Sequence, residues 1–167
     1  MPRKSASSPA GPVGATPLSV LQRFRVLIRT AQRHSQWIER QSGVTGAQLW
    51  ALQELRDRPG LRVGELANLM ALHQSTASNM IDKLESAGLM RKERTSADQR
   101  VVRLYLTDSG AELLGRAPSP ARGVLPEALR LLSEEDLARL QADLEVLLKQ
   151  IKGMDEGFGM QPLPFTE

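Results

Sequence analysis

A stripe of apolar side chains at helical spacing marks the first element of the chain. Between residues 18 and 42 this stripe predicts one long amphipathic helix. Gly43 follows directly and is suited to end the helix, because glycine readily adopts the left-handed conformation common at helix C-termini. The stripe consists of Leu21, Phe24, Ile28, Ala31 and Ile38. A stripe of this length needs an apolar partner surface.

Three shorter helices are expected next. Thr45 begins a capping box, which predicts a second helix that closes at Pro59. Apolar periodicity then predicts a third helix at about residues 63–71 and a fourth at about residues 74–87, with Gly88 after it. The third and fourth helices, joined by a tight turn, have the pattern of a helix-turn-helix.

The fourth helix has one apolar face and one polar face. Ala67 on the third helix is small enough for the two backbones to cross closely, and Ala77 and Met80 hold the fourth helix against it. The opposite face carries short polar side chains, which are Gln74, Ser75, Thr76, Ser78 and Asn79. Amide groups bond adenine edges in the major groove of DNA, and hydroxyl groups bond bases or phosphates. An ordinary solvated helix face is the alternative, and this pattern alone allows it equally well.

Two short extended runs, at residues 89–94 and 100–107, predict a β-hairpin after the fourth helix. The hairpin carries a group of cationic side chains, which are Arg91, Lys92, Arg94, Arg100 and Arg103. A projecting arm with these charges reaches the minor groove beside a helix that lies in a major groove. We assign the contact to Arg100 and an orienting role to Asp98; a surface ion pair without DNA is the alternative.

Helical signals return after the hairpin and continue almost to the end of the chain. They cover residues 108–116, break at a pair of prolines, restart at about 124–132 and finish in a leucine-rich helix at 134–151. Both ends, residues 1–16 and 153–167, are poor in apolar periodicity and rich in small residues or proline, which predicts flexible tails.

Composition limits the class of protein. The chain has 167 residues with 41% hydrophobic residues, which suits one domain, here residues 17–152. The net charge of +3 conceals an asymmetry: residues 1–116 hold 17 Lys and Arg against 10 Asp and Glu, whereas residues 117–167 hold 5 against 9. The basic part suggests an anionic partner such as nucleic acid, with an unevenly charged solvated surface as the alternative.

Several other functions find no support in the sequence. The chain has no cysteine, which excludes disulfides and thiolate metal sites and is compatible with the cytoplasm. It lacks a signal-peptide core and an apolar run of membrane-spanning length, so we expect neither export nor a membrane partner. With two histidines and no catalytic or phosphate-binding motif, it is expected not to be an enzyme and to need no cofactor or metal.

A series of short motifs in this order resembles the MarR family of transcription regulators. The motifs are Gln48, Glu65-Leu66-Ala67, Ser75-Thr76, Asp82-Lys83-Leu84-Glu85, Gly88-Leu89, Asp98-Gln99-Arg100, Leu106-Thr107 and Gly110. The resemblance spans about residues 18–152. Two positions depart from the family pattern: His73 stands where a better helix N-cap is usual, and Lys92 replaces an arginine.

The resemblance implies a mainly α fold with a small β-hairpin wing. In that fold a winged helix-turn-helix, here about residues 45–107, is joined to N- and C-terminal dimerisation helices, here about 18–42 and 108–152. It implies a homodimer that binds a near-palindromic operator in double-stranded DNA, as a repressor released by a small effector. The expected DNA-binding residues are Gln74, Ser75, Thr76, Ser78, Asn79, Lys83, Arg91, Lys92, Arg94, Asp98 and Arg100.

Two questions stay open in the sequence. Family members often bind a small aromatic effector between the dimer helices and the winged domain, and His34, Trp37 and Trp50 are candidates to line such a pocket. The alternative is two packing tryptophans and an exposed histidine. A winged helix that binds protein instead of DNA is the second functional hypothesis, which the polar outer face of the fourth helix disfavours.

Overall fold

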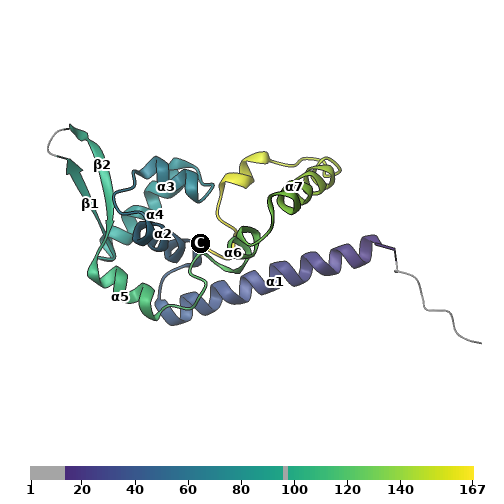
Figure 1. Cartoon of the computed structure of the whole chain (residues 1–167), viewed down its shortest axis with the longest axis horizontal. Helices are drawn as coiled ribbons and strands as arrows, with labels where there is room; N and C mark the ends of the chain where they lie inside the picture. Colours follow the sequence, from purple (N-terminus) through teal and green to yellow (C-terminus); the bar gives the residue numbers. More distant parts are fainter. Residues whose placement is uncertain (1–13, 96–97) are drawn as a thin grey trace, which may run out of the picture.

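The chain folds into a mainly helical molecule with one β-hairpin, as the sequence predicts (Figure 1). The computed structural model describes the backbone of residues 14–95 and 98–167, and the side chains of these residues except 95–100. Within these ranges it contains seven α-helices, a two-stranded antiparallel sheet and one 3-10 helix. The hairpin projects at the end of the molecule opposite the start of the first helix.

The first helix, α1 (Pro17–Ser42), is long and only partly covered. Thr16 begins it with a capping box, which satisfies amide groups that have no partner inside the helix. Ile38, near its C-terminal end, is fully buried, whereas Leu21 and Ile28 are 44% and 52% exposed. Part of the N-terminal half of the predicted apolar stripe therefore stays uncovered within the described residues, while Phe24 is half-buried.

Helices α2 (Gly46–Asp57), α3 (Val63–Leu69) and α4 (Gln74–Ser86) form the compact part of the fold. α2 lies in the middle, and its leucines are fully buried: Leu49, Leu52 and Leu55. At the crossing of α3 and α4, Ala67 and Ala77 are buried, as expected for two backbones that approach closely. The predicted helix-turn-helix is therefore confirmed.

The wing consists of β1 (Met90–Thr95) and β2 (Asp98–Leu106), which pair antiparallel. Met90 pairs with Leu106 at the base of the wing. The regular register shifts between Arg94 and Thr95. Leu104 is fully buried and also forms a bridge with Leu61, so the base of the wing is tied to the core.

α5 (Asp108–Arg116) begins directly after the wing, where Thr107 caps it. The helix approaches Leu89, in the connection between α4 and β1, so closely that a side chain at position 110 would clash. A Cβ atom at Gly110 would lie 2.1 Å from the carbonyl oxygen of Leu89 and 2.7 Å from a methyl group of Leu106. This packing explains why a glycine stands at position 110, in the first turn of α5.

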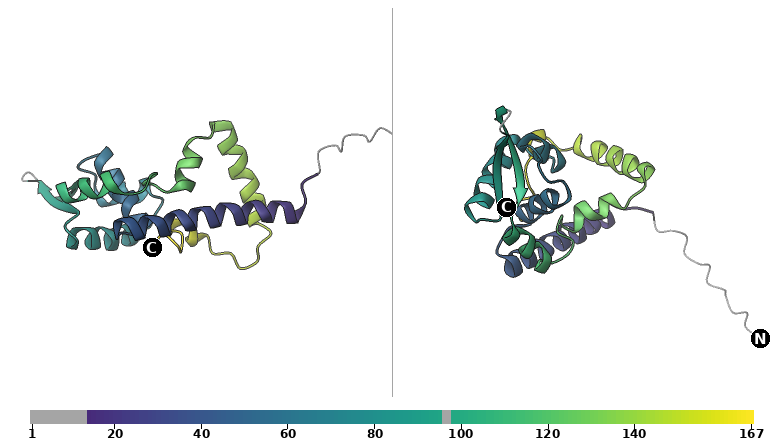
Figure 2. Two further views of the ribbon diagram at one scale, coloured as in Figure 1. Left: turned by 90° about the horizontal axis from the view of Figure 1, so that it is seen from below. Right: turned by 60° about the vertical axis from the view of Figure 1, so that its left-hand side comes forward.

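α6 (Val124–Arg130) and α7 (Glu134–Leu148) lie to one side of α1, away from the wing (Figure 2). α6 contacts α1. The leucines of α7 remain substantially exposed: Leu137, Leu140 and Leu144 are each 37% exposed, and Leu147 and Leu148 are each 42% exposed. α7, like the start of α1, thus carries apolar side chains that the described chain leaves uncovered.

The C-terminal segment differs from the flexible tail that the sequence predicts for residues 153–167. It forms the 3-10 helix η1 (Glu156–Met160) and then runs back to the compact part of the fold. The carbonyl oxygens of Met160 and Thr166 accept hydrogen bonds from the amides of His73 and Ala47. Sequence periodicity misses this path because the segment is held by backbone groups and by scattered apolar side chains. Of the predicted N-terminal tail, residues 1–13 lie outside the described residues.

No helix among the described residues is both long enough and apolar enough to cross a membrane. They also contain no group of three or more histidine, aspartate or glutamate side chains arranged to hold a metal ion.

Candidate nucleic-acid interface

The polar face of α4 is open to solvent. Gln74, Ser75, Asn79 and Lys83 are exposed, and Thr76 and Ser78 are half-buried at the edges of the face. The opposite side is anchored by buried apolar side chains, which are Ala77, Met80, Ile81 and Leu84. Since one face is fixed in the core, the other presents its amide and hydroxyl groups in a defined orientation. A rigid helix with this face has the shape and chemistry to enter a major groove.

The start of α4 is held in an unusual way. His73 occupies the N-cap position, and its side chain makes no capping hydrogen bond. Its backbone amide instead donates to the carbonyl oxygen of Met160 at 2.9 Å. The weak cap expected from the sequence is therefore present, and a distant segment of the chain contacts the same point.

Lys92 fastens the wing to α4. Its ammonium group lies 2.5 Å from Asp82 and 2.8 Å from Glu85, and its backbone amide also donates to Glu85. The hydrogen bond that this ammonium group donates to Asp82, and then the one it donates to Glu85, hold the pKa of Lys92 above its usual range. This charge is thus shared with two carboxylates of α4, and Lys92 connects the wing to that helix.

The other cations of the wing are arranged differently. Arg91 pairs with Glu93 at 2.7 Å and stacks over the ring of Tyr105 at 5.2 Å. Arg94 is exposed and forms no ion pair with the part of the chain that the structure describes. The side chains of Asp98 and Arg100 lie outside the described residues, so their assigned roles stay predictions. The backbone places both at the start of β2.

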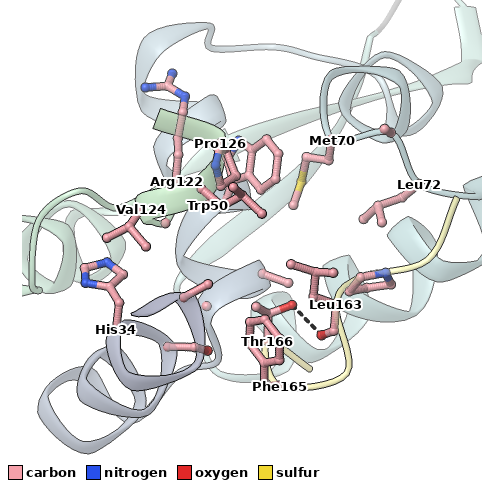
Figure 3. A pocket seen from close by; sticks show the side chains of 18 of the residues that line it. His34, Trp50, Met70, Leu72, Arg122, Val124, Pro126, Leu163, Phe165 and Thr166 are labelled. Atoms are coloured by element: carbon pink, nitrogen blue, oxygen red, sulfur yellow. Dashed lines mark hydrogen bonds between the residues drawn. The ribbon is translucent and has the colours of Figure 1, made fainter. Parts of the chain in front are cut away.

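A cavity of about 290 Å³ lies behind the helix-turn-helix (Figure 3). His34 and Trp50 line it, from α1 and α2, as the effector hypothesis expects. Trp37 does not; it is 51% exposed and contacts the His34 ring edge-to-face. The remaining wall comes from the α3–α4 turn, from the start of α6 and from the C-terminal segment, including Met70, Leu72, Val124, Pro126, Leu163 and Phe165.

Beside this cavity, Arg122 joins the α5–α6 connection to α2. Its guanidinium group lies 2.7 Å from Glu54 and 2.5 Å from Asp57, and Trp50 donates to Glu54 at 2.9 Å. Hydrogen bonding to Glu54 is the largest cause that raises the pKa of Arg122. Sequence reasoning missed this cluster, because only a lone arginine within a proline-rich connection hints at it.

On the other side of the cavity, the ring of His34 is held in one orientation. Its Nε2 donates to the carbonyl oxygen of Pro120 at 3.0 Å, which fixes the proton on that nitrogen, since a carbonyl group only accepts. The α5–α6 connection is therefore tied both to α1 and to α2.

Comparison with known proteins agrees with this geometry. The model of the MarR family matches residues 44–102. The transcriptional repressor MdtR of Bacillus subtilis is 32% identical over 71% of this chain and 76% of its own. The repressor NicR of Pseudomonas putida is 30% identical over 95% of this chain and all of its own. A solved structure of an S. aureus MepR mutant bound to an oligodeoxyribonucleotide is 25% identical, with a TM-score of 0.51, over 81% of this chain and 99% of its own.

Proposed function

The chain belongs to the MarR family and is a DNA-binding transcription regulator, and we propose that it acts as a homodimeric repressor on a near-palindromic operator. The observation that carries the proposal is the exposed polar face of α4 beside a cationic wing. The role needs binding and release alone, with no chemical reaction and no cofactor.

In the proposed complex, α4 lies in the major groove and the wing lies over the adjacent minor groove. Gln74 and Asn79 read base edges, because their amides both donate and accept. Lys83, Arg94 and Arg100 contact phosphates or the minor groove, whereas Lys92 keeps the wing at the right angle to α4 through its two ion pairs.

The dimer forms through the apolar surfaces that a single chain leaves open. The first half of α1 and the stripe of α7 both expose apolar side chains, such as Leu21 on α1 and Leu144 on α7. A second copy covers them and places two copies of α4 about one helical turn of DNA apart, which gives the operator its two-fold symmetry.

A small molecule regulates the protein by binding in the cavity behind the helix-turn-helix. Two of the three residues that the sequence singles out, His34 and Trp50, line this cavity. It lies between α1, α2 and the start of α6, so an occupant sets the angle between the DNA-binding part and the dimerisation helices. A change in that angle alters the spacing of the two recognition helices and releases DNA.

The reading role of α4 is tested by replacing Gln74 and Asn79 together with alanine. We expect binding to the DNA upstream of the chain's own gene to weaken by roughly ten- to a hundredfold, while binding to unrelated DNA stays the same. Gln141→Ala, on α7, is the matched control and should change neither affinity. Equal loss on both DNAs would assign these side chains to backbone contacts that read no bases, and no loss would remove them from the interface; either result would contradict the reading role.

A further inference from the structure

The C-terminal segment from residue 156 to residue 166, here called the strap, joins the starts of two helices. The carbonyl oxygen of Met160 accepts from the amide of His73, the N-cap of α4, at 2.9 Å. The carbonyl oxygen of Thr166 accepts from the amide of Ala47, in the first turn of α2, at 3.0 Å. Amides at helix starts have no partner inside their own helix, so the strap supplies what they lack.

The strap also forms one wall of the cavity behind the helix-turn-helix (Figure 3). Phe158, Leu163 and Phe165 line the cavity, opposite side chains of α1, α2 and α6. Phe158 is 67% exposed and Leu163 is 43% exposed, while Phe165 is half-buried, so much of the apolar surface of the strap stays uncovered. A segment with few buried contacts opens at a low free-energy cost, and a ligand in the cavity would cover apolar surface that the strap now exposes.

The far end of the strap comes close to the face proposed to read DNA. Glu167, which follows the strap, lines a second hollow together with Thr76, Asn79 and Lys83 of α4. The strap therefore runs from the cavity to both the start and the polar face of the recognition helix.

The chemistry of the cavity wall defines the molecule that it accepts. Among the described lining residues apart from His34, only Arg122 is ionisable, and its guanidinium group is already bound to Glu54 and Asp57. These two carboxylates outnumber the one cation, and the Nε2 of His34 is already bonded to the Pro120 carbonyl. A ligand carboxylate would therefore meet a net negative cluster beside Arg122 and lose its hydration with no cationic group free to replace it there. The rest of the wall is mostly apolar, and its polar side chains include Ser35, Gln161 and Thr166, whose hydroxyl donates to the Leu163 carbonyl.

We propose that the strap is the closing wall of a site for an uncharged, largely apolar small molecule, and that it transmits occupancy of this site to the start of α4. The proposal rests on the effector release proposed above and specifies the ligand class and the moving part. An occupant contacts both the strap and the fixed walls, so it favours the closed strap. Closure strengthens the hydrogen bonds to His73 and Ala47 and fixes α4 relative to α2.

The ligand class is tested by titration calorimetry on the full chain with two matched pairs of probes. The pairs are 2-naphthol with 2-naphthoate, and indole with indole-3-carboxylate; the members of each pair share a ring system and differ in charge at neutral pH. We expect each neutral probe to bind at least about tenfold more tightly than its carboxylate partner. Carboxylates that bind as tightly as their partners, or no binding by either neutral probe, would overturn the proposed class.

The strap itself is tested by amide hydrogen exchange, measured by NMR without DNA. 2-Naphthol should slow exchange at His73 and Ala47 several-fold and leave Leu49 and Ala77 unchanged, since those two amides bond within their own helices. The double variant Leu163→Ser, Phe165→Ser should speed exchange at the same two amides and weaken 2-naphthol binding about tenfold. Met154→Ser, outside the strap and similarly exposed, is the control and should do neither.

These readouts separate the strap from the effector hypothesis. Protection of both amides by 2-naphthol, together with a DNA affinity that 2-naphthol leaves unchanged in a separate titration, supports the strap and contradicts effector release. Exchange at His73 and Ala47 that responds neither to 2-naphthol nor to the double variant overturns the strap, whatever happens to DNA.

Discussion

Replacing Arg122 with methionine should destabilise the fold much more than replacing an arginine on the surface. Methionine keeps most of the aliphatic bulk but leaves the Glu54 carboxylate, which is 5% exposed, with the Trp50 indole as its remaining partner. Removing one partner of a buried ion pair costs about 3–5 kcal/mol. Because Arg122 is 23% exposed and water reaches it, we expect a loss of about 2–4 kcal/mol.

The assay is equilibrium unfolding in urea at a fixed protein concentration, since association of the folded chains adds to the apparent stability. The matched control is Arg139→Met. Arg139 pairs with Glu135 and Asp136 at 3.4 and 3.1 Å, but its side chain is 62% exposed. An exposed pair of this kind contributes about 0–1 kcal/mol.

A double-mutant cycle then isolates the Arg122–Glu54 pair. Glu54→Gln removes the buried charge, so the double variant Arg122→Met, Glu54→Gln should be more stable than the sum of the single losses predicts, by about 1–3 kcal/mol. If Arg122→Met costs no more than Arg139→Met, or if the two losses simply add, the buried cluster does not hold the α5–α6 connection to α2.

The same cluster gives stability a dependence on acid pH. A hydrogen bond from Gln53 is the largest cause that lowers the pKa of Asp57 below 3.8, and bonding to Arg122 adds to it. A lowered folded-state pKa means that this contribution is complete above the unfolded value of 3.8 and disappears as the pH falls through the folded value. With Asp57→Asn, the free energy of unfolding measured in urea should therefore fall less steeply below about pH 4. An unchanged fall below that pH would show that Asp57 does not titrate in this way.

The remaining predictions concern the wing, the dimer and the packing of α5. Arg100→Ala should weaken DNA binding by roughly 1–3 kcal/mol without changing the dimer; unchanged affinity in a titration would remove Arg100 from the interface. Leu144→Asp should break the dimer, because it places a carboxylate in an apolar seam; a stable dimer in sedimentation would refute that interface. Gly110→Ala should cost at least about 2 kcal/mol in urea unfolding, since its Cβ would lie 2.1 Å from the Leu89 carbonyl oxygen. A loss below about 0.5 kcal/mol would mean that α5 shifts freely.

Local rules made much of this fold predictable from the sequence. α1, α2 and the wing begin and end within a few residues of their predicted bounds, because caps, glycines and apolar periodicity act over three or four positions. The core side chains of the helix-turn-helix, such as Ala67 and Ala77, were predicted for the same reason. The same pattern predicts the polar face of α4, because that face lies opposite the side chains buried in the core.

Contacts between distant segments were not predictable in this way. Arg122 reaches Glu54 across 68 positions, and the strap returns to α2 and α4 through backbone carbonyl groups that any residue possesses. Lys92 was expected to meet phosphate, but its partners on α4 depend on the angle between wing and helix. No spacing rule encodes an interaction that exists only after the chain has folded.

A salt series of DNA binding by the unmodified chain tests the proposed regulator most directly, with the DNA upstream of its own gene against unrelated competitor DNA. We predict tight binding that weakens with salt, that favours the upstream fragment, and that protects two half-sites about one helical turn apart. Binding that shows no preference for the upstream fragment at any salt concentration, or no binding even at low salt, would contradict a dimeric, sequence-specific regulator.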